Sequence, residues 1–425
     1  MDYFDLIISA RYKLIDEIIE KCLKRVSKPK TISDLLDTVL LDKYLGIPIF
    51  LALMWAVFQF AFKVSAPFSD TIDMFFSIAS EWVKSNIKNE MLASLIGDGI
   101  FGGLGFILSF LPPLFFIFIA LSLLEDSGYL PRAAFVMDRI LTRVGLHGKS
   151  FIPMLLGFGC NVPAIMACRT IENEIDRKIT IMINPLMSCS ARLPIYVLFA
   201  GTFFPGYEGA VILCIYLLGL VLAAIMAKIF RKIIFGGEPS PLLIELPDYT
   251  IPSVRSVIMN AWVRVKIFLK KASTILFIGA IIIWFLSVFP WDATKGGKLL
   301  EKSYAAMIGH AIEPIIVPLG FDWKVGVALF TGFVAKELVV GTLGILYGVG
   351  VKEKEIMNVI AHNFNQVTAL ALMAMTLIYL PCLATLGVLI RELGSLKLAF
   401  VVVAYELILA YLVAVVIVGI GHVVM

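Results

Sequence analysis

Three of the six cysteines stand beside residues that break helices. Cys160 lies in the stretch GFGCNVP (157–163), Cys189 lies in a Ser-Cys-Ser triplet within PLMSCSARLP (185–194), and Cys382 directly follows a proline. Thiolates favour softer transition metals, whereas amides, hydroxyls and carboxylates favour harder ones. A lining that combines these groups therefore suits a borderline divalent ion such as Fe²⁺ and does not suit sodium.

The residues expected to contact such an ion are Cys160, Asn161, Ser188, Cys189, Glu337 and Cys382. Glu337 is included because it interrupts an apolar stretch, where an inward-facing anion lowers the cost of a dehydrated cation. The alternative is a structural ion pair between Glu337 and either Lys336 or Arg192. We interpret these two basic residues as charge-balancing groups rather than as ligands.

The remaining cysteines and the histidines are assigned structural roles. A lone cysteine in an apolar helix is usually a small hydrophobe, and we interpret Cys22, Cys168 and Cys214 in this way. The chain has no CxxC pair that would indicate a zinc ribbon or an iron–sulfur cluster. No histidine or aspartate accompanies the Ser-Cys-Ser triplet as a base. We therefore expect a transported ion, no tightly bound cofactor and no enzymatic activity.

Breaks in transmembrane helices occur in restricted places. In hydrocarbon every backbone polar group needs a partner, so irregular backbone survives only where protein or a water-filled cavity surrounds it. Each cysteine-bearing break is therefore expected to face the interior of the molecule.

The elements that hold these breaks are expected to be membrane-spanning helices. Of the 425 residues, 60% are hydrophobic and 16% are charged, and the mean hydropathy is +0.94. Too little polar surface remains to coat a soluble globule. Uncharged runs of spanning length occupy 44–62, 99–124, 209–227, 272–291, 363–390 and 407–425. With the interrupted stretches 151–168, 179–204 and 325–348, the sequence predicts an all-α polytopic helical bundle of about eight to ten spans or half-spans.

The distribution of charge predicts the orientation of the chain. Residues 1–43 hold eight Lys/Arg and the segment after the first span holds three, which places the N-terminus in the cytoplasm. The N-terminal sequence lacks the apolar core of a signal peptide, so the first true span is expected to direct insertion. A net charge of +4 with no basic patch interleaved with aromatics argues against nucleic acid as a partner. The lipid bilayer is the expected surrounding.

Seven regions follow from these patterns. They are a cytoplasmic helical stub and lead-in (1–43), a first span, interfacial helix and second span (44–145), a first gate repeat (146–235), a Pro-rich linker (236–261), an intervening span and amphipathic segment (262–321), a second gate repeat (322–396) and a C-terminal span (397–425). Segment 65–90 mixes aromatic and charged residues at helical spacing, which predicts the interfacial amphipathic helix or, alternatively, an ordinary loop helix.

The two predicted repeats have similar patterns. Gly157 and Gly332 each precede a phenylalanine within a broken apolar run, and each is followed by a charged stretch and a polar-interrupted span carrying Cys189 or Cys382. Paired broken helices in an internal repeat indicate a transporter with its site near the middle of the membrane. Because Gly-Phe is common in membrane helices, spacing alone leaves a chance similarity open.

One nucleotide-binding pattern is excluded. Residues 143–150 (RVGLHGKS) end like a phosphate-binding P-loop, but Arg143 stands where that motif needs glycine, and we predict no strand before it. The chain also has no NKxD-type guanine-specificity segment. We do not expect this chain alone to bind GTP.

Five long segments resemble the FeoB family of ferrous-iron transporters. They are LLEDSGYLPRAAFVMDR (123–139), GKSFIPMLLGFGCNVPAIMACRT (148–170), PLMSCSARLPIYVLF (185–199), TGFVAKELVVGTLGILYG (331–348) and YLPCLATLGVLIRELGSLK (379–397). The resemblance covers nearly the whole chain and extends to ARYKLIDEI (10–18), which is similar to the last cytoplasmic helix before the family's first span. Two departures are Cys168, where the family usually has Thr, and Leu186, where Phe is common.

The resemblance implies import of Fe²⁺ across the prokaryotic cytoplasmic membrane through two gate motifs. The family's metal-passage cysteines correspond to Cys160, Cys189 and Cys382, and the glutamate of its AKE motif corresponds to Glu337. As a working mechanism, separate from the resemblance, we expect the ion to enter from outside and to meet Cys160, Asn161, Ser188 and Cys189 before Cys382 and Glu337. The resemblance also implies control by a GTPase that this sequence lacks, either separated from it or naturally a second subunit, with a small FeoA-like protein or further copies as possible partners.

Two other functions are alternatives. The first is a nucleoside-type secondary transporter of related gate architecture, which would need hydrogen-bonding side chains for base and ribose where this chain has thiols. The second is a membrane anchor for a separate GTPase, which would not need thiols in broken helices.

Overall fold

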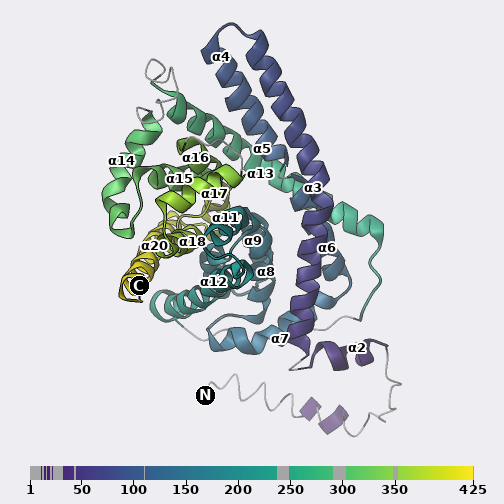
Figure 1. Cartoon of the computed structure of the whole chain (residues 1–425). Coiled ribbons are helices and arrows are strands. Elements are labelled where there is room, and N and C mark those ends of the chain that lie inside the picture. The colour runs from purple at the N-terminus through teal and green to yellow at the C-terminus, as the bar shows by residue number, and fades with distance from the viewer. Residues whose placement is uncertain are drawn as a thin grey trace.

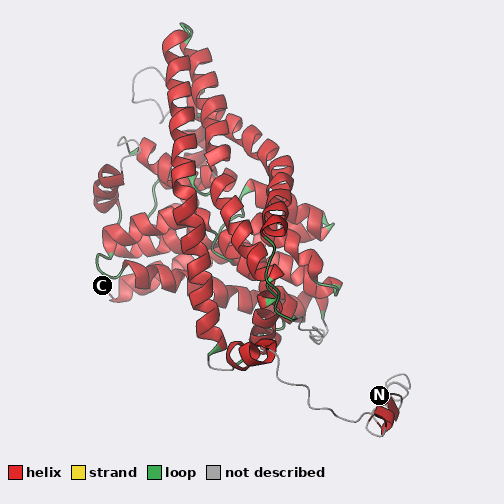
Figure 2. Ribbon diagram, turned by 90° about the vertical axis from the view of Figure 1, so that its right-hand side faces the viewer, coloured by secondary structure: helices red, strands yellow, loops and turns green. Residues whose placement is uncertain are grey.

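The computed structural model describes residues 32–42, 45–109, 111–236, 248–290, 303–347 and 353–424, together with 11, 14, 15, 17–19 and 22. All regular secondary structure in these residues is helical, and they contain no strand (Figure 2). The all-α prediction is thereby confirmed. Most of the predicted cytoplasmic stub and residues 237–247 of the predicted linker lie outside the described residues.

Six helical segments of the described chain are long and apolar enough to cross a membrane. They are Gly46–Asn86, Glu90–Asp126, Glu174–Phe203, Glu208–Phe235, Gln366–Leu393 and Leu396–Gly421. A bent pair, Tyr304–Leu319 with Trp323–Val334, forms a further candidate span with a bend of 111°. Length and composition thus make the chain a multi-pass membrane protein.

The N-terminal elements form a long helical hairpin. They are α2 (Ile32–Leu40), α3 (Gly46–Asn86), α4 (Glu90–Ser94), η1 (Leu95–Gly102), α5 (Gly103–Ser109), α6 (Leu111–Asp126) and α7 (Tyr129–Arg143). α3 packs along η1, α5 and α6, and the end of the hairpin at α4 projects from the rest of the molecule (Figure 1). α7 leads from the hairpin to the first repeat.

The predicted interfacial helix is not a separate element. Residues 65–86 continue α3, which contains 41 residues. A helix of that length measures about 60 Å, roughly twice the hydrocarbon thickness of a bilayer. α3 contains Pro48 in its first turn and Pro67 near the boundary between the apolar half and the mixed half, and the helix continues through Pro67; no glycine follows its first residue. The amphipathic pattern of 65–90 therefore reflects the part of α3 that extends beyond one bilayer thickness.

The region predicted as the first repeat is built from short helices followed by a long one. Its elements are η2 (Gly148–Ser150), α8 (Phe151–Gly159), α9 (Asn161–Ala167), η3 (Cys168–Thr170), α10 (Glu174–Ile183), η4 (Asn184–Leu186), η5 (Ser190–Arg192), α11 (Leu193–Phe203), α12 (Glu208–Phe230) and η6 (Arg231–Phe235). Asn173 begins α10 by accepting hydrogen bonds from the backbone N–H groups of Ile175 and Asp176, at 2.9 and 3.1 Å. Pro194 lies in the first turn of α11, where a missing N–H costs little.

The helix α13 (Val254–Val288) begins inside the range 236–261 predicted as a linker, because Ser253 caps its start by accepting a hydrogen bond from the Ser256 backbone N–H. The chain continues with α14 (Tyr304–Ile316), η9 (Val317–Leu319), α15 (Trp323–Val334), α16 (Leu338–Leu346), α17 (Glu353–Asn363), α18 (Gln366–Ile378), α19 (Leu383–Leu393) and α20 (Leu396–Val424). Local signals set several of these boundaries. Asn365 and Thr368 form a reciprocal capping box at the start of α18. Gly394, with φ of 62°, ends α19 in the left-handed conformation that favours glycine.

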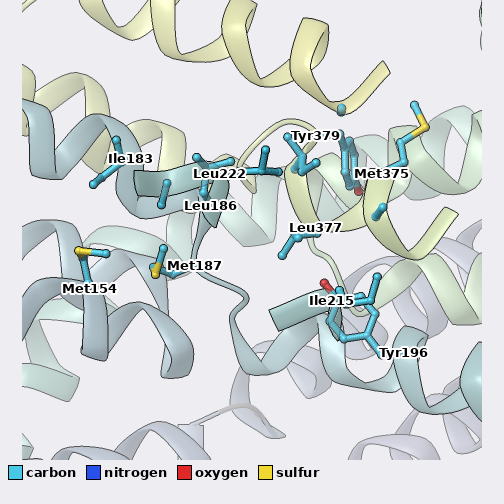
Figure 3. Close-up of a cluster of buried hydrophobic side chains, with 14 of the residues drawn as sticks. Met154, Ile183, Leu186, Met187, Tyr196, Ile215, Leu222, Met375, Leu377 and Tyr379 are labelled. Atoms are coloured by element: carbon cyan, nitrogen blue, oxygen red, sulfur yellow. The ribbon is translucent and has the colours of Figure 1, made fainter. Parts of the chain in front are cut away.

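The two predicted repeats share one hydrophobic core. α11 and α12 both pack against α18, which in turn packs against α20 (Figure 1). Leu186 and Leu377 are fully buried in this core, and Figure 3 shows them with neighbouring side chains from both halves of the chain. The outward faces of the long helices carry exposed apolar side chains, including Trp55 of α3, Leu213 of α12 and Leu412 of α20. Such faces are suited to contact with lipid.

Candidate functional site

The first break separates α8 from α9. α8 ends at Gly159, Cys160 is extended with φ of −154° and ψ of 130°, and α9 begins at Asn161. Asn161 is buried. With its amide oriented to satisfy its neighbours, its nitrogen donates to the carbonyl oxygens of Gly157 (3.2 Å) and Asn184 (3.3 Å). Asn161 therefore ties α8 to η4 as well as lying beside Cys160.

The second break lies between α10 and α11. Cys189 occupies extended backbone between η4 and η5. Arg192 is buried and donates hydrogen bonds to the carbonyl oxygens of Met187 (3.0 Å) and Pro185 (3.1 Å). Pro185 lies in the short helix η4 and Met187 directly follows it, so the guanidinium supplies partners for carbonyls at the point where the helix is broken. This contact gives Arg192 a structural role in the second break, and the charge-balancing role expected from the sequence stays a prediction.

The third and fourth breaks belong to the region predicted as the second repeat. α15 ends at Val334 and α16 begins at Leu338, which leaves Lys336 and Glu337 between two helices. α18 ends at Ile378, and Cys382 caps the start of α19 in extended backbone. α19 packs against α9, and this contact brings the fourth break beside the first.

The four breaks meet at one cavity. Its volume is about 60 Å³, and because a single water needs about 10 to 15 Å³ of such space, it has room for a few waters or a partly hydrated ion. Its lining includes five predicted residues, namely Cys160, Asn161, Cys189, Glu337 and Cys382. Lys336, Thr385 and the small residues Gly159, Ala191 and Ala335 complete much of the wall.

The sixth predicted residue, Ser188, lies outside this lining. It is buried, and its hydroxyl donates a hydrogen bond to Tyr196 Oη at 3.2 Å. Tyr196 is on α11, so Ser188 connects the second break to the helix that follows it. The structure thus separates Ser188 from its neighbour Cys189, because successive side chains of extended backbone point to opposite sides.

The thiols and the carboxylate share the cavity without forming a closed coordination site. Within the described part of the chain, no three His, Cys, Asp or Glu side chains converge closely enough to hold a metal ion. Cys382 Sγ instead lies 3.0 Å from Thr385 Oγ1, a contact in which either atom can donate. Glu337 forms no ion pair with Lys336 or Arg192 among the described residues. A set of dispersed ligands suits transient contacts with a passing ion better than permanent binding.

Paired glycines give the two repeats a shared physical feature. A Cβ atom on Gly157 would lie 2.8 Å from Asn184 Oδ1 and from Met187 Cβ. A Cβ atom on Gly332 would overlap Tyr379 Oη. In each case a helix packs against the broken segment so closely that only glycine fits, which explains the Gly-Phe pairs that the sequence places in corresponding positions.

Glu406 was missed by the sequence analysis. It lies in α20 and is completely buried, and among the described residues neither of its carboxylate oxygens has a hydrogen-bond partner. It interacts electrostatically with Arg192 and Lys336. The signal was present, since an acidic residue within a hydrophobic span marks a functional candidate, but the last uncharged run was counted from residue 407.

Two family models match the chain. The family described as nucleoside recognition (Gate) matches residues 107–203 and 269–396, which contain all four breaks. The family described as ferrous iron transport protein B C terminus matches residues 212–264. A Campylobacter jejuni protein named Fe(2+) transporter FeoB is 39% identical over 411 residues, covering 94% of this chain and 67% of that protein. The chain belongs to the FeoB family.

Other FeoB relatives are similar along almost the whole chain. The Fe(2+) transporter FeoB of Methanocaldococcus jannaschii is 50% identical over 422 residues, covering 98% of this chain and 63% of that protein. A Fe(2+) transport protein A/Fe(2+) transporter FeoB fusion protein of Porphyromonas gingivalis is 38% identical over 466 residues, covering 99% of this chain and 55% of that protein. The chain thus spans between about half and two thirds of the length of these curated relatives. No solved structure is significantly similar to it.

Proposed function

We propose that this chain forms the path by which Fe²⁺ crosses the membrane in a ferrous-iron transporter. The observation that carries this proposal is the meeting of four helix breaks at one cavity, to which they contribute Cys160, Cys189, Cys382 and Glu337. Thiols and a carboxylate together suit a borderline divalent ion. The names of the FeoB relatives, Fe(2+) transporters, support Fe²⁺ as that ion.

Partial dehydration is the central step of the proposed path. The ion exchanges part of its water for Cys160, Cys189 and the Asn161 oxygen, and then passes Cys382 and Glu337. Ser188 does not line the cavity and contributes through its hydrogen bond to Tyr196. Because an ion must leave as readily as it enters, ligands that do not all converge favour flux over storage.

The proposal also includes the orientation of the chain in the membrane and the partners of the chain. The N-terminus lies in the cytoplasm of a prokaryotic cell, the two gate repeats are residues 146–235 and 322–396, and flux runs inward across the cytoplasmic membrane. The chain acts as a transporter and not as an enzyme, under the control of a separate GTPase. The Porphyromonas gingivalis fusion protein supports a small FeoA-like partner. Further copies of the chain are additional candidate partners, and nucleic acid is not one.

Uptake of ⁵⁵Fe²⁺ into proteoliposomes under reducing conditions tests this function. Cys160→Ser and Cys189→Ser are expected to lower the uptake rate, whereas Cys214→Ser, on an exposed face of α12, is expected to leave it unchanged. Uptake of labelled uridine in place of iron would favour the nucleoside alternative. Equal iron uptake by all three variants would contradict the proposed path.

A further inference from the structure

The backbone has the same conformation at the first and third breaks. Cys160 directly follows α8 with φ of −154° and ψ of 130°, and Ala335 directly follows α15 with φ of −149° and ψ of 128°. Each is the third residue after the glycine of a Gly-Phe pair, Gly157 or Gly332. The same dihedrals at the same distance from a helix end give the two Cβ atoms the same direction relative to the helix. Both residues line the cavity.

The second and fourth breaks match in the same way. Cys189 has φ of −75° and ψ of 160°, and Cys382 has φ of −62° and ψ of 156°. All but two of the described residues that line the cavity fall into equivalent pairs. The pairs are 159–162 with 334–337, Cys189 with Cys382, and Ala191 with Ala384. The cavity therefore lies between two equivalent sets of breaks, as expected for a site at the interface of two repeats.

The residue that follows Cys160 and the residue that follows Ala335 make equivalent contacts. With its amide oriented as above, the nitrogen of Asn161 donates to the carbonyl oxygen of Asn184 at 3.3 Å, in the short helix that leads into the second break. Lys336 Nζ donates to the carbonyl oxygen of Leu380 at 2.6 Å, in the fourth break. In each repeat one side-chain nitrogen thus ties the first break of the pair to the second. The correspondence extends from the backbone to the side chains.

The two repeats differ in the donors that they offer to an ion. At two equivalent positions the first repeat has Cys160 and Val162, whereas the second has Ala335 and Glu337. A soft thiol in one repeat is thus exchanged for a harder carboxylate in the other. Ala335 is the position at which a fourth thiol would complete the set. Sites closed by four thiolates are typical of structural zinc, which is held and not released.

We propose that Ala335 is a specificity-determining residue of the ion path, because an alanine at the position equivalent to Cys160 prevents the path from retaining ions softer than Fe²⁺. This inference rests on the proposed function, since it concerns the selectivity of the same path. Ala335 is not a ligand. Three thiols with Glu337 favour a borderline ion that can leave, whereas a fourth thiol favours Cd²⁺ or Zn²⁺ and slows release.

Equilibrium binding of Cd²⁺ to the purified chain in detergent, under anaerobic and reducing conditions, tests this position without iron flux. The background carries Cys22→Ser and Cys214→Ser, because these two cysteines are exposed. Ala335→Cys is expected to tighten Cd²⁺ binding at least about tenfold and to increase the ultraviolet thiolate-to-cadmium absorption. Its matched control is Ala384→Cys, which adds a thiol to the same cavity where both repeats have alanine. Because a ligand must be directed at the ion, we expect this control to change the Cd²⁺ affinity by less than about twofold.

The binding experiment has two outcomes that would overturn the proposal. The first is an equal Cd²⁺ affinity of Ala335→Cys and Ala384→Cys, with both shown to be folded by size-exclusion chromatography. Both alanines are buried, so the two changes add the same atom to similar surroundings. If Ala335→Cys does not fold, Ala335→Ser replaces it, and its harder hydroxyl is expected to raise the ratio of Mn²⁺ to Cd²⁺ affinity at least about threefold. An unchanged ratio would be the second contrary outcome.

Moving the thiol between repeats tests the equivalence in transport. Cys160→Ala is expected to lower ⁵⁵Fe²⁺ uptake, and Cys160→Ala with Ala335→Cys is expected to recover at least about half of the lost rate. Cys160→Ala with Ala384→Cys should stay low. A transposed variant no faster than Cys160→Ala alone would overturn the equivalence of the two positions. If uptake depends on the thiols in no variant, the proposed function fails, and Cd²⁺ binding alone decides the role of Ala335.

Discussion

The hydroxyl of Ser190 donates a hydrogen bond of 2.9 Å to the carbonyl oxygen of Gly159. Gly159 directly precedes Cys160, and Ser190 directly follows Cys189. One bond therefore joins the two cysteine-bearing breaks of the first repeat and fixes the distance between their thiols. Because Gly159 ends α8, its carbonyl lacks a helical partner and needs this donor.

Replacing Ser190 with alanine should separate the two thiols without removing either. We expect Ser190→Ala to lower the free energy of unfolding by about 1 kcal/mol and to lower ⁵⁵Fe²⁺ uptake by a larger factor than the stability loss explains. Thr202→Val is the control, because among the described residues the Thr202 hydroxyl bonds only to the carbonyl of Leu198 within α11. Equal uptake by the two variants would show that the Ser190 bond does not position the site.

Adding a methyl group to either paired glycine should disturb the packing at a break. Gly157→Ala forces a Cβ atom against Asn184 and Met187, and overpacking of this kind costs about 1 to 3 kcal/mol. Gly332→Ala meets Tyr379 and is expected to lower the melting temperature at least as much. The measurement is thermal unfolding in detergent, followed by tryptophan fluorescence.

Gly341→Ala is expected to have the opposite effect on stability, although Gly341 also lies in a short helix next to a break. A Cβ atom at Gly341 in α16 would meet nothing within 4 Å. Because alanine is the better helix former, this change should stabilise the protein by about 0.5 to 1 kcal/mol. A melting temperature that falls equally in all three variants would mean that these glycines are not required for close approach.

A buried cluster attaches α2 to the membrane-embedded helices. Arg132 of α7 is 2% exposed and donates to Asp37 of α2 from Nε (2.6 Å) and Nη2 (3.2 Å). Tyr249 donates to the same carboxylate at 2.8 Å, and Arg132 lies 3.8 Å from its ring centre. Asp37→Asn leaves the arginine poorly paired and should cost about 2 kcal/mol or more.

The expected readout of Asp37→Asn is local. Hydrogen exchange should become faster in α2 while α18 keeps its protection, because the cluster joins α2 to the core and does not form the core. Loss of protection throughout the protein would show that this cluster stabilises the whole fold. Unchanged exchange in α2 would show that other contacts hold it.

The ion pair between Lys149 and Glu172 makes a small pH-dependent contribution. Lys149 Nζ lies 2.8 Å from Glu172, and this hydrogen-bonded ammonium lowers the pKa of the Glu172 carboxyl below its usual value. The pair therefore adds stability above the unfolded-state pKa of about 4.3 and loses it as the pH falls through the lower folded-state pKa. We expect the difference in melting temperature between the unaltered chain and Glu172→Gln to be small near neutrality, because Glu172 is exposed, and to vanish in acid. A difference that grows on acidification would contradict this sign.

Much of the cavity was predictable because its chemistry depends on local sequence. A cysteine beside glycine and proline in an apolar run marks a break, and a break within a membrane faces inward. Cys160, Cys189, Glu337 and Cys382 line the cavity as this reasoning leads one to expect. Their meeting point depends on the packing of α9 against α19, which short-range pattern does not specify.

The sequence alone did not reveal the direction in which a side chain points or the residue at which a helix ends. Ser188 and Cys189 are neighbours in the chain, but only Cys189 lines the cavity. Residues 65–86 have an amphipathic composition, yet they extend α3, which continues through Pro67. The partner choice of Lys336 was also open, since a lysine and a glutamate in sequence do not reveal that a carbonyl and an aromatic ring will hold the lysine.

The most direct test of the iron path replaces Cys160, Cys189 and Cys382 by serine together and measures ⁵⁵Fe²⁺ uptake into proteoliposomes under reducing conditions. Cys22, Cys168 and Cys214 remain in place, so the variant removes only the thiols of the cavity. The account predicts that uptake falls to the level of protein-free vesicles, while the melting temperature stays close to that of the unaltered chain. Full uptake by the correctly folded triple variant would contradict the claim that these thiols carry the ion across the membrane.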